Sequence, residues 1–294
     1  MKDRLKNTVV ISFVLVCAVA YPAAPANGQS DSDGTAYTEV FYPSAGLRIP
    51  AYLYEPEGEG PFPAVIYNHG SRDGRERESA PFRYIGGLLT RAGYAVLVPE
   101  RRGYGKSDGR IWKQEAGSAG DALVARLQAE TDDVLAALDY LRAVPNVDAR
   151  RVGIMGWSFG GIVTMFAVSR SAAFAAAVDQ AGGALTWDRN ARLRGELISA
   201  AEKTNTPTLL LVAKNDRTTS SITTLAGILD KRGVQHRMVV YDAFTPQRAG
   251  SAAPGHAIFS AQGVRIWEKD VLEFLGRYLA PAPGDPPSKM ERAR

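Results

Sequence analysis

One serine of this chain lies in a sequence pattern typical of an activated nucleophile. Ser158 is the third residue of a Gly-Trp-Ser-Phe-Gly segment that follows the apolar run 151–155 and opens a helical stretch near Phe159. The pattern Gly-x-Ser-x-Gly also occurs by chance, so the pattern alone is weak evidence. Its position strengthens it, because a turn between a strand and a helix lifts the serine Oγ off the sheet. The position therefore predicts that Ser158 is a nucleophile and that the backbone N–H of Phe159 donates to the oxyanion. The alternative is a glycine-rich turn that only packs a helix close to a strand.

A serine hydroxyl needs a general base, and the chain contains three histidines. His256 lies in the segment after the apolar run 238–241, at the end of the sheet where the nucleophile is expected, so we predict it as the base. His236 precedes that run and is predicted to be a surface residue. His69 follows the run 64–67 and is predicted to brace a loop rather than to act as a second base.

The imidazole of a catalytic histidine needs a carboxylate that fixes its tautomer and stabilises its protonated form. Asp216 follows the apolar run 208–213 almost immediately and gives the chain order Ser, Asp, His that a strand–turn–helix nucleophile predicts. We therefore predict Asp216 as the partner of His256. Asp179 and Asp242, which follow neighbouring strands, are the competing carboxylates, and capping of the next helix is the alternative role for Asp216.

An oxyanion hole requires a second backbone N–H beside that of Phe159. The Asn-His-Gly-Ser segment 68–71 leaves the first predicted parallel strand at the same end of the sheet. Gly70 permits a sharp turn that directs the N–H of Ser71 toward the nucleophile. The sequence thus predicts Phe159 and Ser71 as the two backbone donors.

The elements that must position these residues alternate between strands and helices. Two loosely alternating segments, 37–42 and 48–54, suit an antiparallel pair at one sheet edge. Short continuous apolar runs fit parallel strands buried on both faces; they are 64–67, 94–98, 151–155, 175–178, 208–213 and 238–241. Helical stretches lie between them, at 81–92, 127–141, 162–168, 219–231 and 264–278. This order predicts one α/β domain, residues 36–280, with a mostly parallel sheet covered by helices on both faces.

The segment 182–206 separates the predicted strands 175–178 and 208–213. Its length of about 25 residues suits one helix and its loops rather than a cap domain. A thinly covered site favours small to medium soluble esters over long-chain lipids. Trp187 in this segment and Trp157 beside the nucleophile are predicted substrate contacts, with simple packing as the alternative for Trp187.

The two ends of the chain differ in composition from its middle. Residues 1–26 combine a basic start, a short apolar run at 9–20 and an Ala-Pro-Ala segment, which is typical of a cleavable signal peptide. The apolar run is shorter than the ~20 residues that span a bilayer, and an uncleaved anchor is the alternative. Residues 27–35 are predicted to be a linker and residues 281–294 a disordered tail. These features predict a secreted or periplasmic protein.

Composition excludes several classes of protein. The 294 residues are 45% apolar and 22% charged, which rules out collagen-like, coiled-coil and wholly disordered chains. A net charge of +4 gives no case for binding nucleic acid or an acidic membrane surface. With Cys17 as the single cysteine, no intrachain disulfide and no cysteine-based metal site can form.

The sequence resembles the α/β-hydrolase superfamily, specifically its dienelactone-hydrolase-like and prolyl-oligopeptidase-like catalytic domains. The resemblance rests on Asn-His-Gly at 68–70, Glu-Arg-Arg-Gly-Tyr-Gly-Lys-Ser at 100–107, Gly-Trp-Ser-Phe-Gly-Gly at 156–161, Asn-Asp at 215–216 and Gly-His at 255–256. It implies an α/β-hydrolase fold with an eight-stranded sheet. Dienelactone hydrolases proper look like enzymes with a cysteine nucleophile, whereas this chain has Ser158 at the nucleophile position. Prolyl-oligopeptidase-like peptidases carry a propeller for which this chain has no room, so the resemblance implies fold and triad rather than peptide cleavage.

The segment 100–107 has two further interpretations. Its last residues look like the end of a phosphate-binding loop, but Glu100 stands where that loop needs glycine and repels phosphate, so we reject a nucleotide site. In similar hydrolases this segment borders the entrance to the site, which implies that Tyr104 lines it. Arg101 and Arg102 are predicted to form structural ion pairs, with binding of an anionic substrate group as the alternative.

The leading prediction is an exported serine hydrolase that cleaves carboxylic esters, with a small-molecule ester as substrate and no cofactor or metal. A small peptidase or an acyltransferase with the same triad is the alternative. A non-catalytic binding protein of the same fold is a further one, although such a protein is expected to have lost a member of the triad. No nucleic-acid partner and no stable membrane association after signal cleavage are predicted. The oligomeric state is left open.

Overall fold

The computed structural model describes residues 35–117, 120–247 and 253–280. The predicted signal peptide, all but the last residue of the predicted linker and the predicted tail lie outside these residues. Among the described residues, none of the helices is both long and apolar enough to cross a bilayer.

A single eight-stranded sheet carries the predicted strands. Their bounds are β1 Thr38–Ser44, β2 Leu47–Tyr54, β3 Phe62–Asn68, β4 Ala95–Pro99, β5 Val147–Trp157, β6 Ala176–Gln180, β7 Thr208–Ala213 and β8 His236–Tyr241. The order across the sheet is β1-β2-β4-β3-β5-β6-β7-β8. β1 and β2 are antiparallel, β2 is antiparallel to β4, and the remaining pairs are parallel. The predicted fold class is therefore confirmed, antiparallel edge included.

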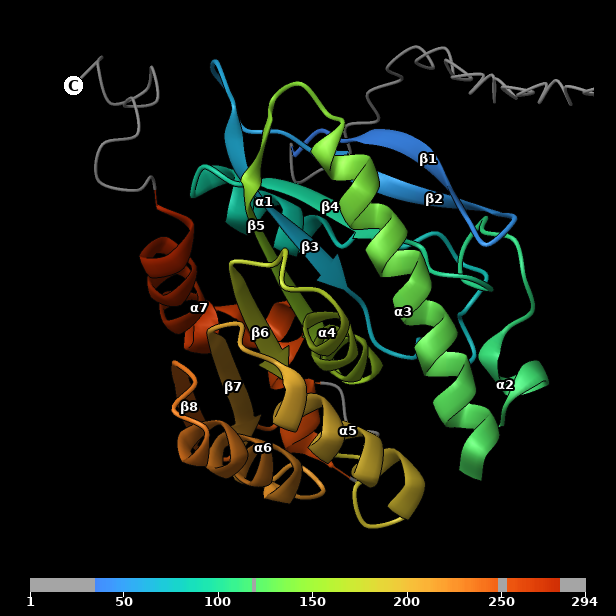
Figure 1. Cartoon of the computed structure of the whole chain (residues 1–294), viewed down its shortest axis with the longest axis vertical. Helices are drawn as coiled ribbons and strands as arrows, with labels where there is room; N and C mark the ends of the chain where they lie inside the picture. Colours follow the sequence, from blue (N-terminus) through green and yellow to red (C-terminus); the bar gives the residue numbers. More distant parts are fainter. Residues whose placement is uncertain (1–34, 118–119, 248–252, 281–294) are drawn as a thin grey trace, which may run out of the picture.

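Helices cover both faces of this sheet. They are α1 Arg83–Arg91, α2 Trp112–Glu115, α3 Gly120–Arg142, α4 Phe159–Arg170, α5 Ala191–Lys203, α6 Ser220–Lys231 and α7 Val264–Leu279, with the 3₁₀ helices η1 Pro254–Phe259 and η2 Ala261–Gly263. α3, α4, α5 and α6 pack side by side in one layer (Figure 1). α7 packs on the opposite face. Residues 153 and 156 of β5 face opposite sides of the sheet. A Cβ on Gly153 would lie 3.0 Å from Leu279 of α7, whereas one on Gly156 would overlap Gly160 of α4. Between β6 and β7 the one helix is α5, as predicted, and no large cap domain is present there.

The helix that follows Ser158, α4, is buried more completely than the others. Every residue from Phe159 to Val168 is buried, so α4 is apolar on all sides and lies within the core. By contrast, α3 buries one stripe, which includes Leu127, Val134, Leu138 and Leu141. This arrangement fixes Ser158 between a central strand and a helix that cannot shift without opening the core.

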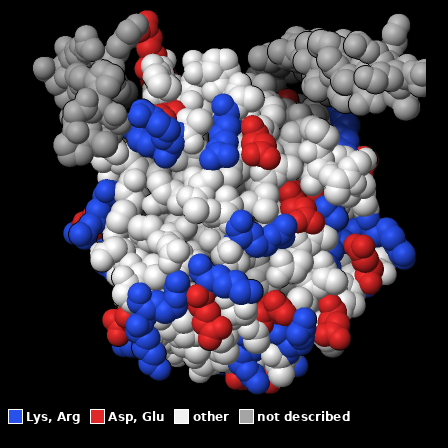
Figure 2. Space-filling model, in the orientation of Figure 1, with Lys and Arg blue, Asp and Glu red and all other residues white. Residues whose placement is uncertain are grey.

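Charged side chains of both signs lie on the surface. On the face shown in Figure 2, Lys and Arg lie among Asp and Glu, toward the centre as well as around the rim. The net charge of +4 is therefore not gathered into one basic area on this face.

Candidate active site

The backbone at Ser158 adopts a strained conformation between β5 and α4. Its φ of 60° and ψ of −118° lie where non-glycine residues rarely occur, a feature that clusters at functional sites. Two backbone hydrogen bonds hold the turn: the N–H of Ser158 donates to the carbonyl of Gln180 at 2.9 Å and that of Ile162 to Ser158 at 3.1 Å. A Cβ on Gly156 would overlap the carbonyl of Gly160, and one on Gly160 would overlap that of Asn68. The two glycines of the motif are thus required by close packing of the backbone.

His256 and Asp216 form a hydrogen-bonded pair. The imidazole lies in η1, and its Nδ1 is 2.8 Å from Asp216 Oδ2. The backbone N–H of Arg217 donates to the other carboxylate oxygen at 2.7 Å. Because an ionised carboxylate only accepts hydrogen bonds, Nδ1 of the neutral ring carries the proton and Nε2 has a free lone pair. The His256 side chain is 9% exposed and that of Asp216 is 0% exposed, so the pair lies almost entirely out of water.

The imidazole lies beside the nucleophile turn. The ring of Trp157, the residue before Ser158, is centred 5.7 Å from that of His256. His256 Nε2 is buried and has no hydrogen-bond partner among the residues that the structure describes, so the bond to Ser158 Oγ is not formed. Such bonds are often long in ligand-free enzymes and shorten when substrate binds.

The loop after β3 packs against Ser158. A Cβ on Gly70 would lie 3.4 Å from Ser158 Cβ and 4.0 Å from its Oγ. Asn68 Nδ2 donates to Thr164 Oγ1 of α4 at 3.1 Å, which ties the start of the loop to the nucleophile helix. The structure therefore brings the segment that contains Ser71 to the side of Ser158.

These elements can be compared with known proteins. The sequence matches the dienelactone hydrolase family over residues 49–279. The chain belongs to this family. Its fold is that of the α/β-hydrolase superfamily, in agreement with the resemblance seen in its motifs.

Three proteins similar to this chain differ in how much of their length it covers. The quorum-quenching protein AidA of Acinetobacter baumannii is 28% identical over 144 residues, which cover 48% of this chain and 42% of AidA. An acylaminoacyl peptidase of Pyrococcus horikoshii superposes with a TM-score of 0.65 at 19% identity, over 88% of this chain and 44% of that one. An esterase of Pyrococcus furiosus superposes with a TM-score of 0.62 at 17% identity, over 88% and 97%. The two structural likenesses show the fold, and this chain spans less than half the length of AidA.

The two competing carboxylates lie elsewhere in this member of the family. Asp242 is exposed and pairs with Lys214 Nζ at 2.6 Å, which lowers its pKa. Asp179 is fully buried against α4, where a Cβ on Gly161 would overlap its Oδ1. Burial raises the pKa of Asp179 to about 7. Of the three candidates, Asp216 is the one that contacts His256.

The predicted substrate contacts have different surroundings. Tyr104 is fully buried, and the guanidinium groups of Arg72, Arg101 and Arg126 lie within 6.0 Å of its ring centre. We therefore assign Tyr104 to the interior, which corrects its predicted place at the entrance. Trp187 is 6% exposed and packs against the turn at Gly183.

Trp157 is half-buried beside the imidazole of His256 and stays a candidate contact. The sequence did not indicate Trp112 of α2, whose ring is centred 5.3 Å from that of Phe159. A four-residue helix has no periodicity that could have revealed it.

The two arginines after β4 form the predicted ion pairs. Arg101 Nε is 2.8 Å from Glu130 Oε2, and Arg102 Nη2 is 2.8 Å from Asp133 Oδ1, both carboxylates being fully buried on α3. The prediction of structural ion pairs is confirmed. Within residues 35–117, 120–247 and 253–280, no cluster of three His, Cys, Asp or Glu side chains could hold a metal ion.

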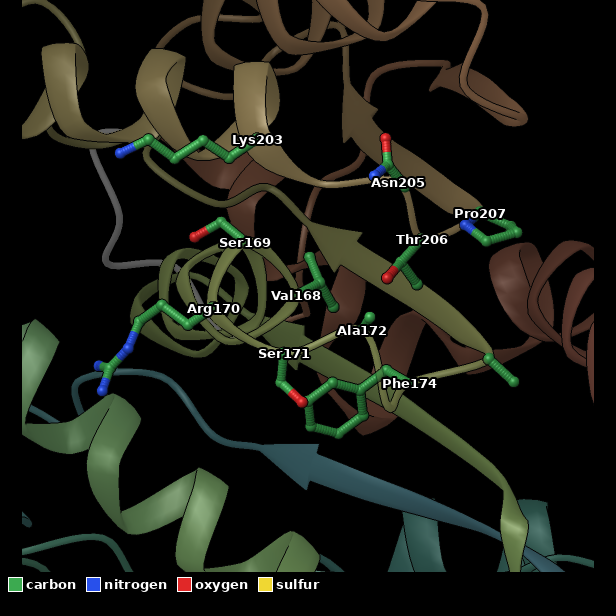
Figure 3. Close-up of a pocket in the computed structure, with 11 residues that line it drawn as sticks. Val168, Ser169, Arg170, Ser171, Ala172, Phe174, Lys203, Asn205, Thr206 and Pro207 are labelled. Atoms are coloured by element: carbon green, nitrogen blue, oxygen red, sulfur yellow. The ribbon is translucent and has the colours of Figure 1, made fainter.

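A cavity of about 390 Å³ lies at the end of the strands that is opposite to Ser158 (Figure 3). The end of α4, the start of β6 and the approach to β7 line it, with Arg170 and Lys203 at its rim. These are the amino ends of the parallel strands, whereas Ser158, Asp216 and His256 follow the carboxyl ends. The cavity contains none of the candidate residues.

Proposed function

We propose that this protein is a serine hydrolase that cleaves carboxylic esters through Ser158, His256 and Asp216. The observation that carries the proposal is the buried His256–Asp216 pair beside the strained turn that contains Ser158. The pair supplies a neutral imidazole whose Nε2 lone pair is free to accept a proton.

In the proposed reaction, Ser158 Oγ attacks the acyl carbon while His256 Nε2 takes the hydroxyl proton. The tetrahedral intermediate collapses, His256 gives that proton to the departing alcohol, and an acyl-serine remains. A water molecule then attacks the acyl carbon with His256 again as base, which releases the carboxylic acid and restores Ser158. Backbone N–H groups of Phe159 and Ser71 hold the oxyanion in both halves.

The electrostatic role of Asp216 follows from its burial. Its carboxylate stabilises the imidazolium that forms in each half-reaction, and at 0% side-chain exposure this attraction is little screened by water. The bond to Nδ1 also holds the ring in the tautomer that presents Nε2 as acceptor.

Small to medium soluble esters are the proposed substrates. The connection between β6 and β7 holds a single helix, α5, so no cap domain from this connection covers Ser158 and supplies a binding surface for a long acyl chain. We further propose export through residues 1–26, on the basic-apolar-small pattern of that segment. A peptidase with the same residues is the second candidate, favoured by the likeness in fold to acylaminoacyl peptidase.

Hydrolysis of p-nitrophenyl esters from acetate to octanoate tests the proposal. We expect the native chain to hydrolyse the shorter esters and Ser158→Ala to reduce kcat by at least about 10³-fold. Equal rates in the two proteins would exclude Ser158 as nucleophile. Cleavage of acyl-peptides without cleavage of esters, lost in the same variant, would favour the peptidase.

A further inference from the structure

Two consecutive carbonyl groups of the loop after β3 accept hydrogen bonds from side chains. His69 Nδ1 is 2.7 Å from the carbonyl oxygen of Gly70, and Arg101 Nη2 donates to the carbonyl of His69 at 2.8 Å. Because a carbonyl oxygen only accepts, the Nδ1 atom of His69 carries the proton.

The geometry of the peptide unit gives these bonds a consequence for the proposed oxyanion hole. In a planar trans peptide the C=O and the following N–H point in opposite directions. A donor that holds the carbonyl of Gly70 therefore also sets the direction of the N–H of Ser71. The bond from Arg101 sets the direction of the preceding N–H, that of Gly70, in the same way.

The imidazole that makes the first bond is held on several sides. The ring of His69 is fully buried. It stacks on the ring of Phe82, with centroids 5.8 Å apart and an interplanar angle of 1°, and packs in a T-shaped arrangement with the ring of Tyr104, with centroids 4.5 Å apart. Burial, together with the positive charges of Arg101 and Arg72, lowers the pKa of His69 well below its usual value. The ring is thus neutral; packing holds its plane, and the bond from Nδ1 to the carbonyl of Gly70 sets its orientation.

The guanidinium that makes the second bond is anchored to α3. Glu130 accepts from Arg101 Nε at 2.8 Å and from Arg126 Nε at 2.9 Å, and the three side chains are at most 1% exposed. Buried ion pairs add little net stability, but they can select one arrangement of the chain. Here they fix the position of Arg101 against the loop after β3.

We propose that His69 and Arg101 are positioning residues for the oxyanion hole at Ser158, an inference that rests on the proposed function. His69 directs the N–H of Ser71 toward the oxyanion, and Arg101 holds the preceding peptide in place. Neither side chain touches the reacting atoms. The bond of an oxyanion-hole donor strengthens as charge develops, so its misdirection slows the chemical step and leaves substrate binding nearly unchanged.

Two substitutions of His69 in the full chain separate positioning from packing. His69→Asn retains an N–H near the place of Nδ1, whereas His69→Leu retains apolar bulk and removes the donor. We expect His69→Leu to lower kcat about 10- to 100-fold with KM within about twofold of native, and His69→Asn to recover most of that loss. A boronic acid that forms a tetrahedral adduct with the nucleophile should lose affinity in proportion to kcat.

Lys106→Ala serves as the matched control. Lys106 follows Tyr104 closely in sequence but is exposed and pairs with Glu39 at 2.9 Å, so the variant should keep native kcat. A folded His69→Leu protein with native kcat and native boronic-acid affinity would overturn the proposal, as would His69→Asn no more active than His69→Leu.

Arg101→Lys provides a second route if His69→Leu does not fold. Lysine retains the charge beside Glu130 but lacks the guanidinium group, whose Nε and Nη2 bond Glu130 and the carbonyl of His69 at the same time. We expect kcat to fall about 5- to 10-fold at unchanged KM. A native kcat in this folded variant would overturn the role of Arg101.

Nitrogen NMR of the three histidines gives a readout that does not need activity. The signals of His69, assigned by their loss in His69→Asn, should show the neutral Nδ1–H tautomer from pH 5 to pH 9. The Nε2–H tautomer, or a ring that titrates in this range, would overturn the positioning role even in an active enzyme. Failure of the proposed function is distinguished by equal ester hydrolysis in the native chain and Ser158→Ala.

Discussion

Replacement of Asp179 by asparagine should make the protein more stable at alkaline pH. The carboxyl group at the end of β6 is fully buried; its Oδ1 accepts from the N–H of Gly182 at 2.7 Å, and its Oδ2 has no partner among the described residues. Burial raises its pKa from 3.8 to about 7. The folded protein therefore favours the protonated, neutral carboxyl group, whose place a neutral amide of the same shape can take.

The sign of the effect follows from the direction of this shift. A group whose pKa is higher in the folded state contributes its full stability below the unfolded pKa and loses it as pH rises through the folded pKa. A shift of about three units corresponds to about 4 kcal/mol in total. Between pH 5 and pH 8 the native chain should lose about 3 kcal/mol that Asp179→Asn retains.

Urea unfolding followed by circular dichroism at pH 5, 6, 7 and 8 measures this difference. Asp242→Asn is the control: that carboxylate is exposed, beside Lys214, and its pKa is lowered, so it is ionised in both folded and unfolded chains over this range. The difference between Asp242→Asn and native should be constant with pH. A difference between Asp179→Asn and native that is equally constant would refute a neutral, buried Asp179.

Two further substitutions test the candidate site. Asp216→Asn should reduce kcat for ester hydrolysis about 10³- to 10⁴-fold with the fold intact, because the amide favours the wrong tautomer of His256; a drop below tenfold, measured by steady-state kinetics, would contradict the proposed triad. Gly160→Ala should lower both the melting temperature and the activity, because the added Cβ overlaps the carbonyl of Asn68 and pushes the loop after β3 away from Ser158. A Gly160→Ala protein with native melting and rates would show that this close approach is not needed.

Much of the fold follows from local patterns in the sequence. Buried parallel strands read as continuous apolar runs, and two of these runs, 151–155 and 208–213, end close to Ser158 and Asp216. Because the carboxyl ends of parallel strands meet at one edge, the positions of Ser158, Asp216 and His256 along the chain sufficed to predict that they approach one another. The hydrogen bond between His256 and Asp216 agrees with that reasoning.

Other features depend on contacts between distant segments, which no local pattern reveals. Tyr104 was placed at the entrance by resemblance, but three arginines from separate segments enclose its ring. The burial of Asp179, which raises its pKa, depends on two glycines, at 161 and 182, because a Cβ at either position would overlap its carboxyl group. Side-chain burial of this kind is set by the tertiary fold and not by spacing along the chain.

The complete burial of α4 also bears on how the molecule opens. Local unfolding begins where few buried contacts hold a segment, so the amide hydrogens of a helix enclosed on all sides exchange with solvent mainly through global unfolding. His256, in contrast, belongs to a 3₁₀ helix of six residues, Pro254–Phe259. Ser158 and His256 therefore belong to parts of the protein with different local stability, and under mild stress the helix that contains His256 should unfold while the turn at Ser158 is still native.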